Sequence, residues 1–344
     1  MAEGDLRHHL LDGRTMAILL PSLLATLVVW WGVASQGREL QQTRFRATVD
    51  EAVAEIVNRI DAYEQVLRAG SALFDASDDV VAGEWRRFVA RLEIERRYPG
   101  IQGIGFARRV SPPDVTGHVD RIRATLYPDY RITPPGGRAI YFPIVFLEPL
   151  DRRNLRAIGY DMYAEPVRHA AMIRAAEQGR AIMSGKVTLV QEIGDDVQAG
   201  TLLYVPVYAH GSDLATVAAR HAALQGFVYA PFRMADLFTA ILGSRLDDLC
   251  VVVEDEGGGS QAELFANRPC EAGRLGERRT IDVNGRQWSV AFRATSRFET
   301  ELGDRFYSYA VLVAGLAVTA LLVVATQSLV AERRRREALI QSNL

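Results

Sequence analysis

The chain has 344 residues, of which 49% are hydrophobic and 24% are charged, and its formal net charge is −2. Its basic residues are scattered among acids, and Lys186 is the single lysine. This composition excludes the basic stripe of a nucleic-acid-binding protein and predicts a folded protein without a nucleic-acid partner.

Two runs without charged residues bracket the chain, at residues 16–34 and 307–329. At about 1.5 Å per residue, each run is long enough for a helix to cross a hydrocarbon core of about 30 Å. We therefore predict two transmembrane helices and the membrane as a partner. A cleavable signal peptide is the alternative for the first run, with Val33-Ala34-Ser35 as a tolerable cleavage site.

The charges that follow the second run predict the topology. Four consecutive arginines occupy 333–336, and such clusters stay in the cytoplasm. Residues 330–344 are then a cytoplasmic linker and residues 1–15 a cytoplasmic arm. Two crossings place residues 36–306 outside, so we expect a multi-pass protein of the inner membrane with a periplasmic or extracellular central segment.

A long helix is predicted at residues 36–79, directly after the first span. From Val49 to Phe74 its apolar residues alternate spacings of four and three, which forms a heptad seam of more than three repeats. A narrow seam of this kind is typical of a stalk that pairs with a second copy. We therefore expect a homodimer through the stalk helix, although a stalk half-buried on its own domain produces the same pattern.

Helices and strands alternate in the remaining outer segment and predict two small antiparallel-sheet domains, at residues 80–209 and 210–306. In the first, we expect helices at 84–96 and 166–178 and strands at 101–107, 139–147, 180–190 and 201–208. Because Pro143 and Pro206 cannot donate to a sheet ladder, their strands should be edges or carry bulges. In the second, we expect strands at 225–230 and 249–254, a helix at 232–242 and a hairpin at 280–293 around Asn284-Gly285.

No constellation of catalytic residues is recognisable in the sequence. Gly103-Ile104-Gly105 lacks the third glycine and the following helix of a dinucleotide-binding turn, and the outer histidines are not at metal-ligand spacing. We therefore predict no catalytic residue, no metal and no cofactor, and expect that the chain is not an enzyme.

The two cysteines, Cys250 and Cys270, both lie in the predicted outer segment. In an oxidising compartment such a pair favours a disulfide, which would close a loop worth about 3 kcal/mol in the chain-entropy model. Two reduced, buried cysteines are the alternative, because Cys250 begins an apolar strand.

Several ordered motifs resemble the CHASE domain, an extracellular sensory module of histidine kinases and nucleotide cyclases. They are Arg97-Tyr-Pro-Gly-Ile-Gln-Gly-Ile-Gly-Phe-Ala107, Tyr141-Phe-Pro-Ile-Val-Phe-Leu-Glu-Pro149, Asn154, Gly159-Tyr-Asp-Met162 and Glu165-Pro-Val-Arg168. The resemblance covers about residues 80 to 230. It implies an α+β fold in which two transmembrane helices flank a long stalk helix and two tandem PAS-like domains. It also implies a small-molecule ligand in the membrane-distal domain and a cytoplasmic output domain or partner of the kinase or cyclase class.

The resemblance also implies a place for the ligand. Plant cytokinin receptors of this family carry an acidic side chain, two residues ahead of the tyrosine, that hydrogen-bonds the adenine ring of the hormone. Ala139 occupies that place here, so a ligand other than an adenine-type cytokinin is expected. Besides Ala139, we expect the pocket to be lined by Tyr141, Phe142, Glu148, Tyr160, Asp161 and Tyr204.

The predicted function is therefore that of a membrane-anchored receptor input module, which binds a ligand outside and transmits the signal to an output domain or partner. Two other classes fit the membrane anchoring. One is a membrane-tethered periplasmic enzyme, and the other is a structural adaptor that dimerises through the stalk without a ligand.

Overall fold

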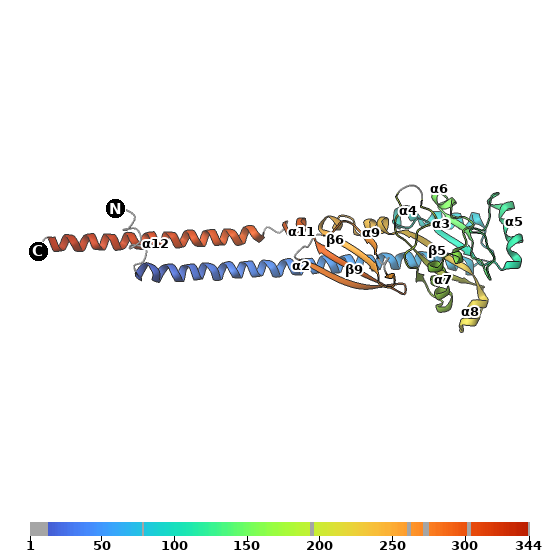
Figure 1. Cartoon of the computed structure of the whole chain (residues 1–344), viewed down its shortest axis with the longest axis horizontal. Coiled ribbons are helices and arrows are strands. Elements are labelled where there is room, and N and C mark those ends of the chain that lie inside the picture. Colours follow the sequence, from blue (N-terminus) through green and yellow to red (C-terminus); the bar gives the residue numbers. More distant parts are fainter. Residues whose placement is uncertain are drawn as a thin grey trace. The chain divides into compact units, whose positions relative to one another are not determined.

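The computed structural model describes residues 13–77, 79–192, 196–259, 263–270, 275–300 and 304–342. The chain forms two compact units. One comprises Ala47–Ser296, and the other comprises the two terminal segments Met1–Arg46 and Arg297–Leu344. Figure 1 shows the long helices α2 (Gly13–Asp75) and α12 (Asp304–Ser342) and the sheets of the central unit.

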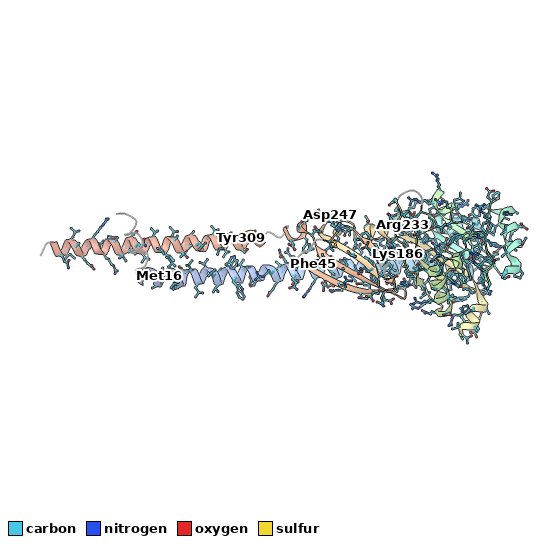
Figure 2. All side chains as sticks on the ribbon, in the orientation of Figure 1. Met16, Phe45, Lys186, Arg233, Asp247 and Tyr309 are labelled. Atoms are coloured by element: carbon cyan, nitrogen blue, oxygen red, sulfur yellow. A yellow bond between two sulfur atoms is a disulfide. The ribbon has the colours of Figure 1, made fainter. Side chains whose placement is uncertain are left out.

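Helices α2 and α12 each contain a stretch long and apolar enough to cross a membrane by length and composition. Only 6% of each stretch is buried inside the protein, which leaves apolar side chains exposed as a lipid-facing helix requires. Met16 and Tyr309 mark the two helices in Figure 2. These features support the two predicted spans.

Small residues lie where α2 and α12 approach each other in the terminal unit. A Cβ atom on Gly315 of α12 would clash with Thr26 of α2. Thr319, one turn further along α12, is 6% exposed and donates its hydroxyl to the Gly315 carbonyl at 2.9 Å. Glycine at this contact therefore permits the close backbone approach that stabilises helix pairs in lipid.

The first sheet of the central unit has five antiparallel strands in the order β2-β1-β5-β4-β3. The strands are β1 (Ile104–Arg108), β2 (Ile144–Glu148), β3 (Ile182–Met183), β4 (Gly200–Tyr208) and β5 (Leu224–Arg233). The accompanying helices are α3 (Ala82–Leu92), α4 (Ile94–Arg97), η1 (Pro112–Asp114), α5 (Val115–Thr125), α6 (Arg152–Leu155), η2 (Met162–Ala164), α7 (Pro166–Gln178) and α8 (Val217–Ala223).

Strand β5 lies at the centre of this sheet, between β1 and β4. The prediction that residues 225–230 belong to the second domain is therefore wrong. The polar connection at 210–220 suggested a domain boundary, but it contains the start of α8 and leads the chain back into the first sheet.

Pro143 and Pro206 occupy positions that a missing N–H donor allows. Strand β2 is an edge strand that begins directly after Pro143, and its register with β1 shifts between Phe106 and Ala107. Pro206 lies in β4, beyond the two residues that pair with β3, and is therefore paired with β5 alone. Its carbonyl accepts a hydrogen bond from Ser71 of α2 at 3.2 Å.

The heptad seam of α2 packs against this sheet. The Phe74 ring stacks on Phe106 of β1 with centroids 4.1 Å apart, and Tyr63 stacks on Phe232 of β5 at 5.4 Å. Trp85 of α3 is fully buried beside Phe74. The seam is thus covered by its own domain, the second of the two interpretations. The predicted homodimer stays a prediction and requires a surface other than this seam.

The opposite face of the sheet is covered by α7. Residues 171, 172, 175 and 176 of α7 are buried in one apolar cluster with the β4 and β5 side chains Leu202, Tyr204, Phe227 and Tyr229. Pro166 begins α7, and Gly179 ends it in the left-handed region with φ 64°. This helix positions the candidate site described below.

The second sheet has four antiparallel strands in the order β7-β6-β9-β8. The strands are β6 (Leu249–Asp255), β7 (Glu263–Ala266), β8 (Gly276–Val283) and β9 (Arg286–Ala294), with helices α9 (Met234–Leu242) and α10 (Arg245–Asp248) nearby. Helix α11 (Ser296–Thr300) follows β9 in the chain. Asn284 (φ 48°) and Gly285 (φ 82°) form the hairpin turn predicted from the sequence. Together, the two sheets and the long terminal helices confirm the mixed helical and antiparallel-sheet class.

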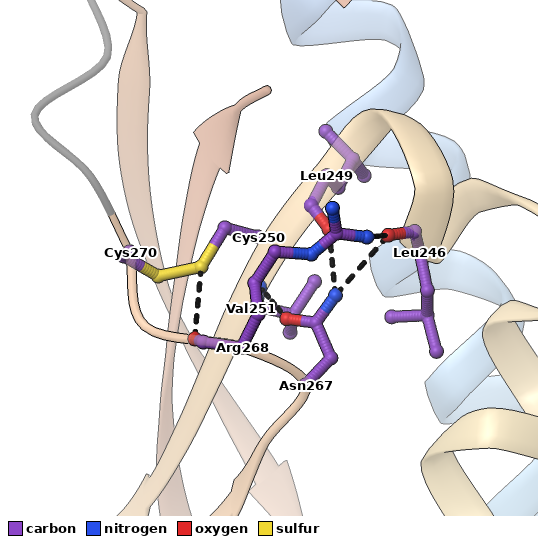
Figure 3. The surroundings of a disulfide bond; sticks show 7 residues. All are labelled: Leu246, Leu249, Cys250, Val251, Asn267, Arg268 and Cys270. Atoms are coloured by element: carbon purple, nitrogen blue, oxygen red, sulfur yellow. Dashed lines mark hydrogen bonds between the residues drawn. A yellow bond between two sulfur atoms is a disulfide. The ribbon is translucent and has the colours of Figure 1, made fainter. Parts of the chain in front are cut away.

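Cys250 and Cys270 form a disulfide that joins β6 to the segment after β7 (Figure 3). Asn267 lies beside it, and its side-chain amide donates to the carbonyls of Leu246 and Leu249. Its side-chain oxygen accepts from the Val251 amide at 2.9 Å. The disulfide and this half-buried amide fix the same loop against β6.

Candidate ligand-binding site

Polar side chains penetrate the apolar layer between α7 and the first sheet. We call Tyr160, Asp161, Arg168, Tyr204 and Tyr229 the inner polar cluster. Asp161, Tyr204 and Tyr229 are 0% exposed and Arg168 is 3% exposed. Buried polar atoms in folded proteins almost always have hydrogen-bond partners. Three atoms of this cluster have none in the described part of the chain: Asp161 Oδ2, Arg168 Nε and the Tyr229 hydroxyl.

Asp161 is held by backbone amides. Its Oδ1 accepts from the amides of Phe142 at 2.8 Å and Tyr163 at 3.1 Å. Its Oδ2 lies 3.4 Å from Arg138 Nε as an ion pair but accepts no hydrogen bond. Burial is the largest influence and raises the pKa of Asp161, while the two amides and Arg138 act in the opposite direction.

A loop closes over Asp161. Tyr141 donates its hydroxyl to the Gly136 carbonyl at 2.9 Å and accepts from the Arg138 amide at 3.0 Å. The Arg138 guanidinium lies 5.7 Å from the centre of the Tyr141 ring. Tyr141 thus orients the arginine that faces the buried carboxylate.

Arg168 enters the layer from the first turn of α7. Glu165 caps this helix by accepting from the amides of Val167 and Arg168. The Arg168 guanidinium lies 4.9 Å from the centre of the Tyr160 ring, and its Nη2 donates to the Thr188 carbonyl at 2.9 Å. Nε is left as a buried donor for a further acceptor.

Tyr204 and Tyr229 are directly paired across β4 and β5, with ring centroids 6.2 Å apart. The Tyr204 hydroxyl lies 3.5 Å from the Met162 sulfur, a weak acceptor, and the Tyr229 hydroxyl has no described partner. Burial raises the pKa of both phenols, so both stay neutral donors. The Tyr229 ring fits because its partner on β1 is Gly105.

The structure brings some of the predicted pocket residues together. Tyr160, Asp161 and Tyr204 belong to the inner polar cluster, and the Phe142 ring packs 4.3 Å from that of Tyr163 at its edge. Tyr141 lies beside the cluster in the Arg138 loop.

Two predicted pocket residues lie apart from the cluster. Ala139 is exposed. Glu148 lies at the far end of β2, opposite Ile104, where its carboxylate pairs with Arg86 at 3.2 Å and accepts from the Leu150 amide. The cluster therefore has no contribution from either residue.

Sequence reasoning missed Arg138, Arg168 and Tyr229. Arg168 had a detectable signal, because it occupies the same helical face as the buried residues at 171, 172, 175 and 176. An arginine on an apolar helical face is either paired inside or functional. Tyr229 carried no such signal, since its strand had been assigned to the other sheet. Among the described residues, no group of His, Cys, Asp or Glu side chains could hold a metal ion.

Comparisons with known proteins identify the family. Residues 78–266 match the CHASE domain, which confirms the predicted resemblance. The hybrid signal transduction histidine kinase A of Dictyostelium discoideum is 27% identical over 248 residues, covering 62% of this chain. The aligned region spans 11% of that kinase. CHASE domains are extracellular sensory input modules, found in histidine kinases among others. Because the match covers more than half of its residues, the chain belongs to the CHASE domain family.

Proposed function

We propose that the chain is a membrane-anchored receptor input module that binds a small molecule at the inner polar cluster. The observation that carries this proposal is the set of three buried polar atoms without hydrogen-bond partners, on Asp161, Arg168 and Tyr229. Leaving a buried polar group unpaired costs about 1–3 kcal/mol. Three such unpaired groups in one layer of the fold favour a bound ligand that supplies their hydrogen-bond partners.

The chemistry of the cluster indicates what it binds. Arg168 Nε and the Tyr229 hydroxyl are donors, whereas Asp161 Oδ2 is an acceptor while the carboxyl is ionised. The ligand therefore carries at least one hydrogen-bond acceptor and one donor, on a body small and apolar enough to lie among Phe142, Tyr160 and Tyr204. No covalent chemistry is assigned to these residues.

In this proposal, the two sheets with their helices are PAS-like domains, and the signal crosses the membrane to a kinase- or cyclase-class output domain or partner. The similarity to a histidine kinase supports that class of output. A ligand can change the output only if it binds two arrangements of the protein with different affinity. In a homodimer, these two arrangements would differ in how the two copies of the chain contact each other.

Thermal-shift screening of the full chain in detergent against small polar metabolites tests the proposal. A ligand at 100 times its dissociation constant stabilises the folded state by about 2.7 kcal/mol, which is a readily measured rise in Tm. We expect Asp161→Asn and Arg168→Met to remove the rise. Arg152→Gln, which removes one charge from an exposed position on α6, should keep it. A ligand whose effect survives both cluster variants would place the site elsewhere.

Topology requires a separate experiment. If residues 36–306 are outside, an alkaline phosphatase fused after Gly211 should be active, whereas a fusion after Leu339 should be inactive. Gly211 is a suitable junction because it lies at an exposed turn with nothing within 4 Å of an added Cβ atom. The reverse pattern would contradict the proposed orientation.

A further inference from the structure

A cavity lies outside the inner polar cluster, where α7 of the first sheet meets the second sheet. It has a volume of about 380 Å³, within the range of small-molecule sites. Ala170 and Arg174 of α7 and Lys186, which follows β3, form one wall. Asp255 at the end of β6 and Arg286 at the start of β9 form the other. Figure 2 labels Lys186 at this position.

The charge in this cleft is unbalanced. It is lined by three cationic side chains, on Arg174, Lys186 and Arg286, and by one carboxylate, on Asp255. Arg174 donates to the Gly285 carbonyl at 2.9 Å, and Lys186 donates to the Glu263 carbonyl at 2.8 Å. Neither forms an ion pair with a carboxylate in the described segments, so the cleft carries an excess of two positive charges.

Arg286 is fixed before any ligand arrives. Its Nε donates to Asp255 Oδ1 at 2.9 Å and its Nη2 contacts Asp255 Oδ2, while Asp255 is 1% exposed. A Cβ atom on Gly257 would lie 2.7 Å from Arg286 Nη2. A glycine at this position therefore leaves room for the guanidinium beside the loop.

The remaining wall of the cleft is apolar. Pro166, Val167, Ala170 and Met183 line it on the α7 side. A purely inorganic ion would leave these side chains against water, whereas an organic anion covers them with its carbon skeleton.

We propose that this cleft binds a small organic anion, held through a carboxylate or phosphate group by Arg174, Lys186 and Arg286. The anion contacts both sheets and so adds a second input to the central unit. This inference does not depend on a ligand at the inner polar cluster. Its test measures the modification of Lys186, which lies outside that cluster.

The test uses Lys186, the single lysine of the chain. Reductive methylation with formaldehyde and borohydride modifies lysine amines, and mass spectrometry of the Lys186 peptide gives its rate. Succinate and phenyl phosphate are the probes, and sodium chloride at matched ionic strength is the reference. We expect saturable protection of Lys186 by at least one probe and none by chloride. Succinate separates a carboxylate site from a phosphate site.

Variants of α7 establish where the protecting anion lies. Ala170 is exposed and lines the cleft, so Ala170→Glu adds a carboxylate there without removing a native contact. It should raise the half-protecting concentration about tenfold or more, as loss of a charge-assisted contact does. Ala170→Gln controls for side-chain size, and Gln178→Glu places the same charge on α7 outside the cleft. Both controls should keep protection. Protection that chloride reproduces, that never saturates, or that Ala170→Glu leaves unchanged would overturn the proposal.

Discussion

Gly105→Ala tests whether the first sheet is built around the Tyr229 ring. Gly105 pairs directly with Tyr229 across β1 and β5. A Cβ atom on Gly105 would lie 2.6 Å from the Tyr229 Cε1, Cζ and hydroxyl oxygen. Because Tyr229 is 0% exposed, its ring cannot swing out into solvent to relieve this clash. Overpacking of this kind costs about 1–3 kcal/mol, and we expect Gly105→Ala to lower the free energy of unfolding by that amount.

A double-mutant cycle isolates this contact. Tyr229→Ala alone should cost about 3–5 kcal/mol because it leaves a cavity. In the Tyr229→Ala background, Gly105→Ala no longer meets a ring and should cost little, so the coupling energy should be about 1–3 kcal/mol. Gly117→Ala is the matched control. It lies in α5 with nothing within 4 Å of its Cβ position, so alanine should be neutral or stabilising there.

Urea unfolding of the full chain in detergent, followed by tryptophan fluorescence, measures these free energies, since Trp85 is fully buried against the opposite face of the same sheet. Displacement of Tyr229 should also weaken any ligand of the inner polar cluster. If Gly105→Ala were as stable as the parent, or if its cost were the same with and without the Tyr229 ring, the proposed packing would be wrong.

Three further predictions follow from the structure. Cys250→Ser combined with Cys270→Ser should lower the free energy of unfolding by about 3 kcal/mol, measured by urea unfolding, because it opens a 20-residue loop. Burial raises the pKa of Asp161 above its usual 3.8. The protonated Asp161 carboxyl therefore contributes to the free energy of unfolding fully below pH 3.8, and this contribution is lost as the pH rises through the folded-state pKa. The Tm of Asp161→Asn, relative to the parent, should therefore increase with pH. Gly315→Leu should separate α2 from α12 and reduce membrane crosslinking between cysteines placed at Ser22 and Thr319, whereas the same change at Gly32, which has no close neighbour, should not.

The local elements of the first sheet were largely predictable from the sequence, because their signals are steric. Prolines marked β2 and the open part of β4, and Pro166 with Gly179 bounded α7. Gly103 and Gly105 indicated a face without side chains, and the structure places the Tyr229 ring against Gly105. Each of these inferences needed only the backbone rules of single residues.

Long-range pairing was less predictable. The strand at 225–230 lies beside β1, which is more than a hundred residues earlier, and no local pattern records such a partner. The seam of α2 was equally ambiguous, because a second helix and a sheet both cover a narrow apolar stripe. Of the candidate site, the family motifs contain Tyr160 and Asp161, and Tyr204 was also expected in the pocket, but the partners that arrive from α7 and β5 were missed.

Strand β5 connects the two faces of the first sheet, since its side chains alternate between them. Tyr229 faces the inner polar cluster, while its neighbour Val228 lies next to Gly70 of α2 and Phe232 stacks on Tyr63. Protein interiors are close-packed, so a ligand that moves Tyr229 cannot leave β5 and its contacts with α2 unchanged. We therefore expect binding at the cluster to shift α2 through these two contacts. The same helix also carries the first apolar span.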